Sequence, residues 1–573
     1  MDAKAVYEEW LSSPYYDEAT KAELRAIADD ENEITERFYT ELEFGTAGLR
    51  GIIGAGTNRM NTYTVRKATQ GLANYILKTG KESQGVAISY DCRHYSPEFA
   101  DESACTLAAN GIKAYVFESL RPTPELSYAV RFLGCAAGIN ITASHNPPAY
   151  NGYKVYWEDG AQITPPHDAG IMAEVKAVAD QSMVKTMSKD EAIAAGLYEV
   201  IGENVDAPYL AEVKKYISNQ AAIDAVGDQI TVVYTPLHGT GNIPVRRVLK
   251  EIGFTDVNVV KEQELPDGDF PTVSYPNPEA EEAFALGLRD AKALDADLVL
   301  ATDPDADRLG VRVKDAQGEY HTLTGNMSAA LICEYMMSQR SDIPADGAIV
   351  KSVVSTNLMD AIAEYYGVEL IEVLTGFKWI GKTILGFEEA GKGTYLFGME
   401  ESYGCLPGTY ARDKDAVAAS MILCEAAAYY KTQGMTMWDK MVEMYERYGY
   451  YQDEAISITL AGKEGIEKIG TIMEALRADT PASFGDLKVL SKRDYQEGIT
   501  RDLLTGETKP AGLPKSNVIY YDLENNAWVC VRPSGTEPKI KLYYGVKGTS
   551  AADAADEAAK LKAALESYVG QYE

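Results

Sequence analysis

The chain has 573 residues, of which 46% are hydrophobic and 24% charged, the mixture of an ordinary globular protein. Its 54 Lys and Arg residues are outnumbered by 86 Asp and Glu residues, and the net charge is −32. Such an acidic surface repels nucleic acid and anionic membranes, which excludes both as partners, and an anionic substrate needs a local basic patch.

The N-terminal sequence MDAKAVYEEW lacks the basic and apolar regions of a signal peptide, and no apolar run reaches 18 residues. The seven cysteines are scattered and include no CxxC pair, which is typical of reduced thiols. We therefore expect a cytoplasmic protein without a membrane span.

Short apolar runs alternate with longer Ala-rich helical patterns along most of the chain. Strand, helix, strand at this spacing predicts parallel or mixed sheets covered by helices, which is an α/β fold. The final helix is expected to begin with a capping box at Ser550 and Asp553. The predicted strands are 85–90, 137–141, 230–234, 297–300, 347–350, 394–397, 528–531 and 540–544, and the clearest helices are 98–110 and 326–340.

A polar cluster follows four of these strands. Ligands of α/β sheets bind at the carboxyl ends of strands, so each cluster is a candidate part of a binding site. The clusters are separated by about 160, 95 and 135 residues, each near the size of one domain, which predicts four domains around a shared cleft. The clusters are TASHNP (142–147), DPDADR (303–308), GMEESYG (398–404) and RPSGTEPK (532–539), and the expected connections between domains are 197–208, 319–326 and 446–454.

Asp303, Asp305 and Asp307 alternate directly after an apolar run. Residues two apart in an extended segment point the same way, so we expect the three carboxylates to converge. Three like charges held together need a cation, and an all-oxygen cluster favours Mg²⁺ first and Mn²⁺ or Ca²⁺ next. Three carboxylates leave a coordination position for water or a phosphate oxygen. The alternative is a solvated acidic turn without a metal.

Ser144 lies in a tight segment beside His145. A serine hydroxyl is a poor nucleophile until a base or a preorganised electrostatic site activates it. Adjacency in sequence does not place His145 within hydrogen-bond distance. The alternative is a turn capped by Ser and Asn side chains.

The cluster that starts at Arg532 suits a phosphate group. Arg532 offers a forked donor, Ser534 and Thr536 offer hydroxyls, and Gly535 lets backbone amides approach closely. The alternative is a hairpin turn, and both interpretations are compatible.

Glu400 and Ser402 alternate after a predicted strand and can both face a cleft, where they suit a pair of sugar hydroxyls. The alternative is a solvated acidic loop. The Gly-rich segment 44–51, which contains Arg50, is a further candidate phosphate cradle.

Together, TASHNP, DPDADR, GMEES and RPSGTEPK, in this order and spacing, resemble the α-D-phosphohexomutase superfamily. FGTAGLRG (44–51) and RDKD (412–415) match its motifs as well, and the resemblance spans nearly the whole chain. TPLHGTG (235–241) and TGFKWIG (375–381) are similar to the bacterial phosphoglucomutases related to eukaryotic phosphoglucomutase-2.

This resemblance implies four domains around a central cleft, of which three are similar α/β domains with mixed sheets and the fourth is a smaller C-terminal α+β domain. The implied domains are a phosphoserine domain (1–205), a metal-binding domain (206–322), a sugar-binding domain (323–450) and a phosphate-binding domain (451–573). The implied reaction moves phosphate reversibly between O1 and O6 of glucose phosphate, with Mg²⁺ as cofactor and glucose 1,6-bisphosphate as intermediate and activator.

The resemblance also implies a role for each matching residue. Ser144 carries the phosphoryl group, and its phosphate joins Asp303, Asp305 and Asp307 in binding Mg²⁺. The candidate acid/base is Lys154 or His145, and a neutral Lys154 requires burial or cationic neighbours because a free lysine titrates near 10.4. The implied basic residues near the moving phosphate are Arg50, Lys154, Arg308 and Lys414, and the implied contacts of the sugar and its second phosphate are Gly376, Phe377, Glu400, Ser402, Arg532, Ser534, Gly535 and Thr536.

Other functions remain open at this point. Phosphomannomutase or phosphopentomutase activity on the same scaffold is the first alternative, because one hydroxyl contact decides the substrate. A metal-dependent phosphatase is less favoured, since the five histidines show no ligand spacing. A non-catalytic Ca²⁺-stabilised scaffold is the third alternative. We expect a monomer or a homodimer that acts on a small sugar phosphate.

Overall fold

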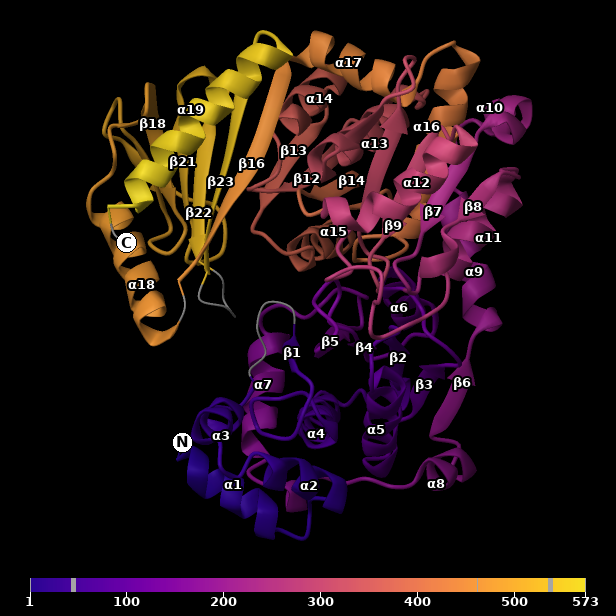
Figure 1. Ribbon diagram of the computed structural model, residues 1–573, viewed down its shortest axis with the longest axis vertical. Coiled ribbons are helices and arrows are strands. Elements are labelled where there is room, and N and C mark those ends of the chain that lie inside the picture. The colour runs from indigo at the N-terminus through magenta and orange to yellow at the C-terminus, as the bar shows by residue number, and fades with distance from the viewer. Residues whose placement is uncertain (1, 43–47, 461, 534–538, 572–573) are drawn as a thin grey trace.

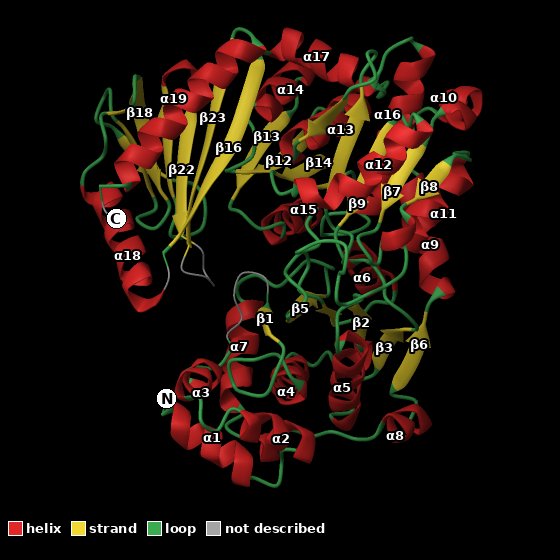
Figure 2. Cartoon of the chain, viewed as in Figure 1, coloured by secondary structure: helices red, strands yellow, loops and turns green. Residues whose placement is uncertain are grey.

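The computed structural model describes residues 2–42, 48–460, 462–533 and 539–571. Its chain forms four sheets, and the C-terminal sheet lies apart from the N-terminal region across the middle of the molecule (Figure 1). Helices cover the first three sheets, and two helices accompany the fourth (Figure 2). The α/β fold expected from the sequence, with a smaller C-terminal domain, is confirmed.

The first sheet has six strands in the order β1-β5-β4-β2-β3-β6. Strands β4, β2, β3 and β6 run parallel to one another, whereas β5 is antiparallel to both β4 and β1. Three further helices, α1–α3, form a small aromatic cluster with α4: Trp10 of α1 and Tyr16, which precedes α2, contact Tyr63 of α4, and Phe38 of α3 contacts Trp10. The elements are β1 (Leu49–Ile52), β2 (Val86–Tyr90), β3 (Ala114–Phe117), β4 (Ala137–Ile141), β5 (Tyr150–Trp157) and β6 (Tyr198–Ile201), with α1 (Ala3–Ser12), α2 (Glu18–Ala26), α3 (Glu31–Phe38), α4 (Thr62–Lys78), α5 (Ser96–Ala109), α6 (Thr123–Phe132), α7 (His167–Ala177) and α8 (Lys189–Ala194).

The second and third sheets repeat this plan, because in each the last parallel strand is followed by an antiparallel partner. Their orders are β11-β10-β9-β7-β8 and β13-β12-β14-β15. The second group is β7 (Val232–Thr235), β8 (Val257–Val259), β9 (Leu298–Thr302), β10 (Leu309–Lys314) and β11 (Tyr320–Leu323), with α9 (Glu203–Lys214), α10 (Gln220–Val226), α11 (Asn242–Ile252) and α12 (Ala285–Leu294). The third is β12 (Gly347–Ser352), β13 (Glu369–Val373), β14 (Thr394–Glu400) and β15 (Gly404–Leu406), with α13 (Gly325–Ser338), α14 (Leu358–Tyr366), α15 (Lys378–Ala390), α16 (Ala416–Thr432) and α17 (Met437–Tyr448).

In the described part of the fourth sheet every strand pair is antiparallel, and the long strands β16 and β23 pair along their whole length. Ser550 caps the last helix as predicted, but the capping box is wrong, because the Asp553 carboxylate accepts from the Thr549 amide rather than from that of Ser550. The elements are β16 (Tyr450–Thr459), β17 (Ser483–Phe484), β18 (Leu487–Asp494), β19 (Ile499–Asp502), β20 (Thr508–Pro510), β21 (Ile519–Leu523), β22 (Trp528–Pro533) and β23 (Lys539–Gly548), with α18 (Gly462–Ala478) and α19 (Ala551–Val569).

The predicted strands lie where the apolar runs placed them, and β4 has the bounds predicted for it. The expected connection 197–208 contains β6, which pairs with β3, and the first residues of α9. The seven cysteines are all free. In the part of the chain that the structure describes, no helix combines the length and the apolar character needed to cross a bilayer.

Candidate active site

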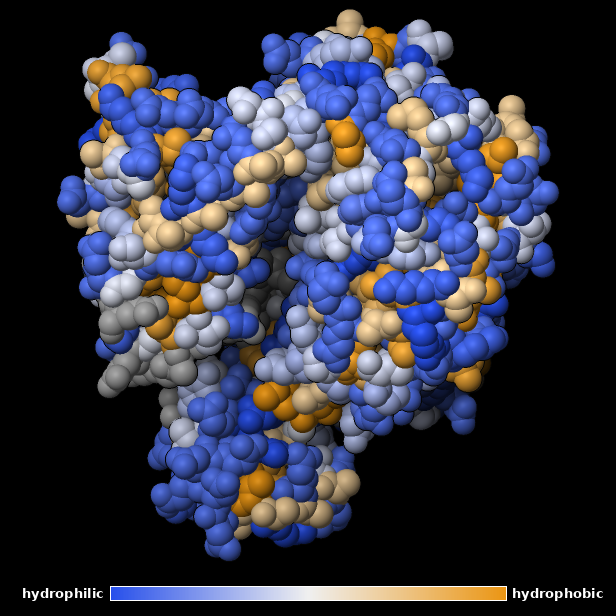
Figure 3. All heavy atoms as spheres, turned by 45° about the horizontal axis from the view of Figure 1, so that its top comes forward, coloured by the Kyte–Doolittle hydropathy of each residue, from blue (hydrophilic) through white to orange (hydrophobic). Residues whose placement is uncertain are grey.

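A cavity of about 550 Å³ is lined by residues of all four sheet regions. Arg50 and His145 come from the first, Arg308 from the second, Ser402 from the third and Arg532 from the fourth. The surface of the molecule is visibly hollowed near its middle (Figure 3). One cavity therefore joins clusters that are hundreds of residues apart in the sequence.

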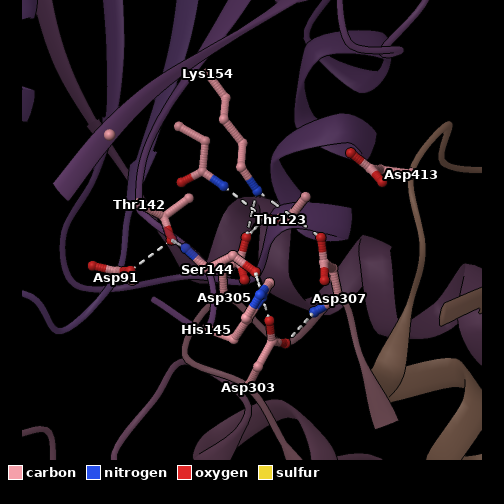
Figure 4. Close-up of polar contacts among 12 residues, drawn as sticks. Asp91, Thr123, Thr142, Ser144, His145, Lys154, Asp303, Asp305, Asp307 and Asp413 are labelled. Carbon is pink, nitrogen blue, oxygen red and sulfur yellow. Dashed lines mark hydrogen bonds and ion pairs between the residues drawn. The ribbon is translucent and has the colours of Figure 1, made fainter. Parts of the chain in front are cut away.

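Ser144 lies in the connection between β4 and β5, with a left-handed φ of 51° that is uncommon for a residue with a side chain. Its amide donates to Thr142 Oγ1 at 2.8 Å, and its hydroxyl donates to Asp303 Oδ2 at 2.9 Å. His145 Nδ1 is 3.1 Å from Ser144 Oγ, so the two neighbours are within hydrogen-bond distance (Figure 4). Burial, followed by Arg308 and Arg50, lowers the pKa of His145, which favours a neutral ring.

The three aspartates converge as predicted, but by a different geometry. Their ligand atoms lie within 4.8 Å of one another, and Asp303, Asp305 and Asp307 are all buried. Residues 303–307 form a turn rather than an extended strand, because the Asp303 carboxylate accepts from the amides of Asp307 and Arg308. The burial contradicts the alternative of a solvated acidic turn.

The electrostatics of this triad fit a cation. Burial, then Asp305, raises the pKa of Asp307, and burial with both neighbours raises that of Asp303. Burial would also raise the pKa of Asp305, but Lys154 holds it far below its usual range. Asp305 Oδ1 and Asp307 Oδ1 are buried, and neither has a hydrogen-bond partner among the residues that the structure describes. Two orphaned carboxylate oxygens beside a third carboxylate suit a hard divalent ion.

Two lysines from other sheets face the triad. Lys154 of β5 lies 2.8 Å from Asp305 Oδ2 and 4.0 Å from Asp307 Oδ2. Lys414, from the loop before α16, lies 2.8 Å from Asp307 Oδ2 and 3.2 Å from Asp413. Burial would lower the pKa of Lys414, but Asp307 and Asp413 raise it above its usual value. These two of the four predicted basic residues thus contact the triad.

The two arginines implied near the phosphate have polar partners at the cavity. Arg308 Nη1 is 2.6 Å from Glu279, and Arg50 Nη1 donates to Asn146 Oδ1 at 2.9 Å. Arg50 is thereby tied to the loop that carries Ser144. With these partners, Arg50 and Arg308 both line the cavity.

The candidate sugar contacts are divided between the cavity and the core. Glu400 ends β14, and its Oε1 accepts from the Gly376 amide at 2.6 Å. Gly376 has a φ of +115°, a conformation that favours glycine. Ser402 lines the cavity, whereas Phe377 is buried, with its ring 5.6 Å from Lys414 Nζ.

Arg532, near the end of β22, lines the cavity from the C-terminal side. Ser534, Gly535 and Thr536 lie outside the described residues, as do residues 44–47 of the Gly-rich segment.

Sequence reasoning missed Asp91 and Arg93, which follow β2 and support the Ser144 loop. Asp91 accepts from Thr142 Oγ1 at 2.6 Å, and buried Arg93 donates to the main-chain oxygens of Ser144 and Asn146, and also of Pro147 and Tyr150 at 2.9 and 3.0 Å. The signal was available, because this polar pair comes directly after a predicted strand, as the four recognised clusters do.

Models of the phosphoglucomutase/phosphomannomutase family match four successive parts of the chain. The alpha/beta/alpha domains I, II and III match residues 41–182, 207–318 and 324–448, and the C-terminal domain matches residues 501–564.

The chain belongs to this family.

Among curated family members, the phosphoglucomutase of Staphylococcus epidermidis is 37% identical over 543 residues, covering 94% of this chain and 95% of its own. That of Staphylococcus aureus is 38% identical, covering 93% and 95%.

Solved structures share the fold. The phosphoglucomutase parafusin of Paramecium, in its open form, has a TM-score of 0.67 at 16% identity, covering 93% of this chain and 96% of its own. A family protein of Burkholderia thailandensis has a TM-score of 0.62 at 20% identity, covering 91% and 97%.

Proposed function

We propose that the protein is a phosphoglucomutase, which interconverts α-D-glucose 1-phosphate and glucose 6-phosphate through a phosphoserine at Ser144. The observation that carries the proposal is the contact of Ser144 Oγ with Asp303 Oδ2 at 2.9 Å, next to His145, which lines a cavity to which all four sheet regions contribute. Relatives over nearly the full length that bear the name phosphoglucomutase support this substrate.

Asp303, Asp305 and Asp307 would hold Mg²⁺, with Ser144 beside them. The fit rests on the two orphaned buried oxygens of Asp305 and Asp307. Bound there, the ion would supply positive charge next to the transferring phosphoryl group. We further propose the division of the chain into domains at 1–205, 206–322, 323–450 and 451–573, and a cytoplasmic location, which the seven free thiols support.

The reaction takes two transfers. In the first, the bond between Ser144 Oγ and phosphorus breaks while the free sugar hydroxyl forms a new bond to phosphorus, which makes glucose 1,6-bisphosphate. The sugar then turns round, and Ser144 takes the other phosphate. Phosphoryl transfer depends on positioning and on charge stabilisation. Arg308 and Arg50 would supply positive charge from the walls of the cavity, and Lys414 would supply it from beside Asp307.

Each transfer also moves one proton from the attacking hydroxyl and returns one to the leaving oxygen. Two residues are candidates for this role. His145 Nδ1 is 3.1 Å from Ser144 Oγ, and Lys154 is ion-paired with Asp305 beside it. Glu400 and Ser402 would bind the sugar hydroxyls, with Gly376 and Phe377 in the adjoining loop, and Arg532, Ser534, Gly535 and Thr536 would bind the phosphate that does not react.

Ser144→Ala provides the test. We expect at least a thousandfold loss of glucose 6-phosphate formation from glucose 1-phosphate, because the variant has no oxygen to carry the phosphoryl group. The wild-type protein should also carry one phosphate, detected by intact mass and absent from the variant. Ser103→Ala, which removes another buried hydroxyl of the first sheet region, is the matched control and should keep full activity. Full activity of Ser144→Ala would disprove the phosphoserine mechanism.

A substrate panel separates the alternatives. Rates of phosphate transfer on glucose, mannose and deoxyribose phosphates should be highest for glucose. A preference for mannose or a pentose would make the enzyme a phosphomannomutase or phosphopentomutase, and release of inorganic phosphate without isomerised sugar would indicate a phosphatase.

A further inference from the structure

A buried chain of polar side chains runs beneath Asp305. Ser89 of β2 donates to Asn140 Oδ1 at 3.1 Å, and Asn140 of β4 donates to Thr123 Oγ1 at 2.7 Å. Thr123 then donates to Asp305 Oδ2 at 2.7 Å (Figure 4). All four side chains are fully buried. The chain crosses from the first sheet to the turn that holds the acidic triad.

The direction of these hydrogen bonds is determined by the chemistry of each group. A carboxylate only accepts, so the single hydroxyl proton of Thr123 is committed to Asp305. The Thr123 oxygen can then only accept, and it does so from the amide of Asn140. The opposite orientation of that amide would bring two oxygens without a proton together. Ser89, by donating to Asn140 Oδ1, stabilises the same orientation.

Thr123 makes a second hydrogen bond to the turn that contains Asp305, through its backbone. It is the first residue of α6, where a helix has backbone N–H groups without intrahelical partners. Its amide donates to the Asp305 carbonyl oxygen at 2.9 Å. One residue therefore holds both the main chain and the side chain of Asp305.

The hydrogen bonds of Thr123 leave one carboxylate oxygen of Asp305, Oδ1, available to a metal ion. Oδ2 accepts from both Thr123 and Lys154, whereas Oδ1 has no hydrogen-bond partner within the described chain. Removing the Thr123 hydroxyl would allow the Asp305 carboxylate to rotate toward Lys154. Oδ1 of Asp305 would then no longer be held in one direction.

We propose that Thr123, oriented by Asn140 and Ser89, is the positioning residue that aims Asp305 at the divalent ion. The proposal rests on the metal site of the proposed mutase. Groups that orient metal ligands from behind typically contribute 10–100-fold to metal affinity.

Thr123→Val tests this, because valine keeps the shape and the backbone N–H but lacks the hydroxyl. Mn²⁺ is the probe, and its dissociation constant is measured by calorimetry on the full-length protein. We expect about 10–100-fold weaker binding, with Thr123→Ser restoring the affinity to within about threefold. At saturating Mn²⁺, kcat should recover most of its wild-type value, which a general structural defect would not allow.

Thr106→Val is the matched control, since Thr106 is an equally buried threonine of α5 whose hydroxyl has no partner in the described structure. Its Mn²⁺ affinity should equal that of the wild type. Asn140→Ala gives a second route if Thr123→Val does not fold, and it should weaken Mn²⁺ binding severalfold. When Thr123→Val and Asn140→Ala are combined, their losses of Mn²⁺ affinity should not add, because both substitutions act through the Thr123 hydroxyl.

Two results would overturn the inference. The first is wild-type Mn²⁺ affinity in folded Thr123→Val or, if that variant does not fold, in Asn140→Ala. The second is an equal loss of Mn²⁺ affinity in Thr123→Ser and Thr123→Val. Failure of the proposed function looks different, because the wild-type protein itself would then bind no Mn²⁺ or convert no sugar phosphate.

Discussion

Arg93 is the buried guanidinium that holds the Ser144 loop in place. It donates to four main-chain oxygens between residues 144 and 150, and its Nε lies 3.3 Å from the carboxylate of Asp91. The left-handed conformation of Ser144 is therefore maintained by a charged side chain rather than by the local sequence. Strain of this kind persists only where the surroundings enforce it.

Arg93→Met should unfold with a free energy about 3–5 kcal/mol lower than the wild type, because it leaves the Asp91 charge buried and unpaired. Urea denaturation measures this. Arg66→Met is the control, since it breaks a partly exposed pair with Glu102 at 2.7 Å and should cost no more than about 1 kcal/mol. Equal losses in the two variants would show that Arg93 has no special structural role.

Glu401 is a second residue whose surroundings lead to a prediction. Its Oε2 accepts from Ser352 Oγ at 3.0 Å, and burial, followed by Glu400, raises the pKa of Glu401 to about 7. An unfolded glutamate titrates near 4.3. The unfolded chain thus ionises first as pH rises, so stability is fully present below about pH 4 and is lost as pH rises to about 7.

Glu401→Gln should remove this pH dependence. Relative to the wild type, its free energy of unfolding should rise by up to about 3 kcal/mol between pH 4 and pH 8. Urea denaturation at both pH values measures the change. Parallel stability curves for the two proteins would contradict the raised pKa.

The hairpins that follow parallel strands explain why the site residues meet. Ser144 lies between β4 and β5, the aspartates lie between β9 and β10, and Ser402 lies between β14 and β15. In each case the last parallel strand ends and its antiparallel partner begins. Repeating one element plan three times therefore presents three different loops at equivalent positions.

Gly152 is where the first of these hairpins meets β1. It pairs with Arg50, and a Cβ there would lie 2.5 Å from the Thr142 oxygen and 2.8 Å from that of Leu49. Gly152→Ala should therefore push β1 away, displace Arg50, lower the mutase rate and destabilise the fold by about 1–3 kcal/mol. Gly386→Ala on α15, where the added carbon meets open space, should instead stabilise by about 0.5–1 kcal/mol. Equal melting temperatures and equal mutase rates of Gly152→Ala and Gly386→Ala would refute this prediction.

The buried triad connects three of the four sheet regions. Asp305 contacts Thr123 and Lys154 of the first, and Asp307 contacts Lys414, which lies beyond the third sheet. The chain has a net charge of −32, yet basic side chains gather beside the triad, where buried carboxylates and a phosphorylated substrate would otherwise repel each other. An ion on the triad should therefore stabilise the whole molecule.

Mg²⁺ should raise the melting temperature and EDTA should reverse the effect. Binding at 100 times the dissociation constant stabilises by about 2.7 kcal/mol. Asp305→Asn should abolish this response, while Asp290→Asn, at an exposed pair with Arg289, should keep it. An unchanged melting temperature of the wild type across the Mg²⁺ titration would argue against a metal on the triad.

Most of the fold and half of the site could be predicted because they depend on local patterns. Apolar runs of four to six residues located β4 and β9, and polar clusters after them marked Ser144 and the aspartates. The convergence of the aspartates was predicted for the wrong reason, because side-chain hydrogen bonds of Asp303 fold the segment into a turn. Local patterns could not show whether His145 reaches Ser144.

Sequence patterns alone identified the candidate chemical groups of this protein: the carboxylates proposed to bind metal, the serine and the nearby cations, together with the family to which they point. The contacts among these groups, such as that of Ser144 with Asp303, 159 residues away, follow from the packing of the folded chain. The tertiary structure also revealed the supporting residues Arg93 and Thr123 and placed Phe377 in the core. The physical reason is that chemistry resides in side-chain types, whereas contacts between distant segments depend on how whole sheets pack.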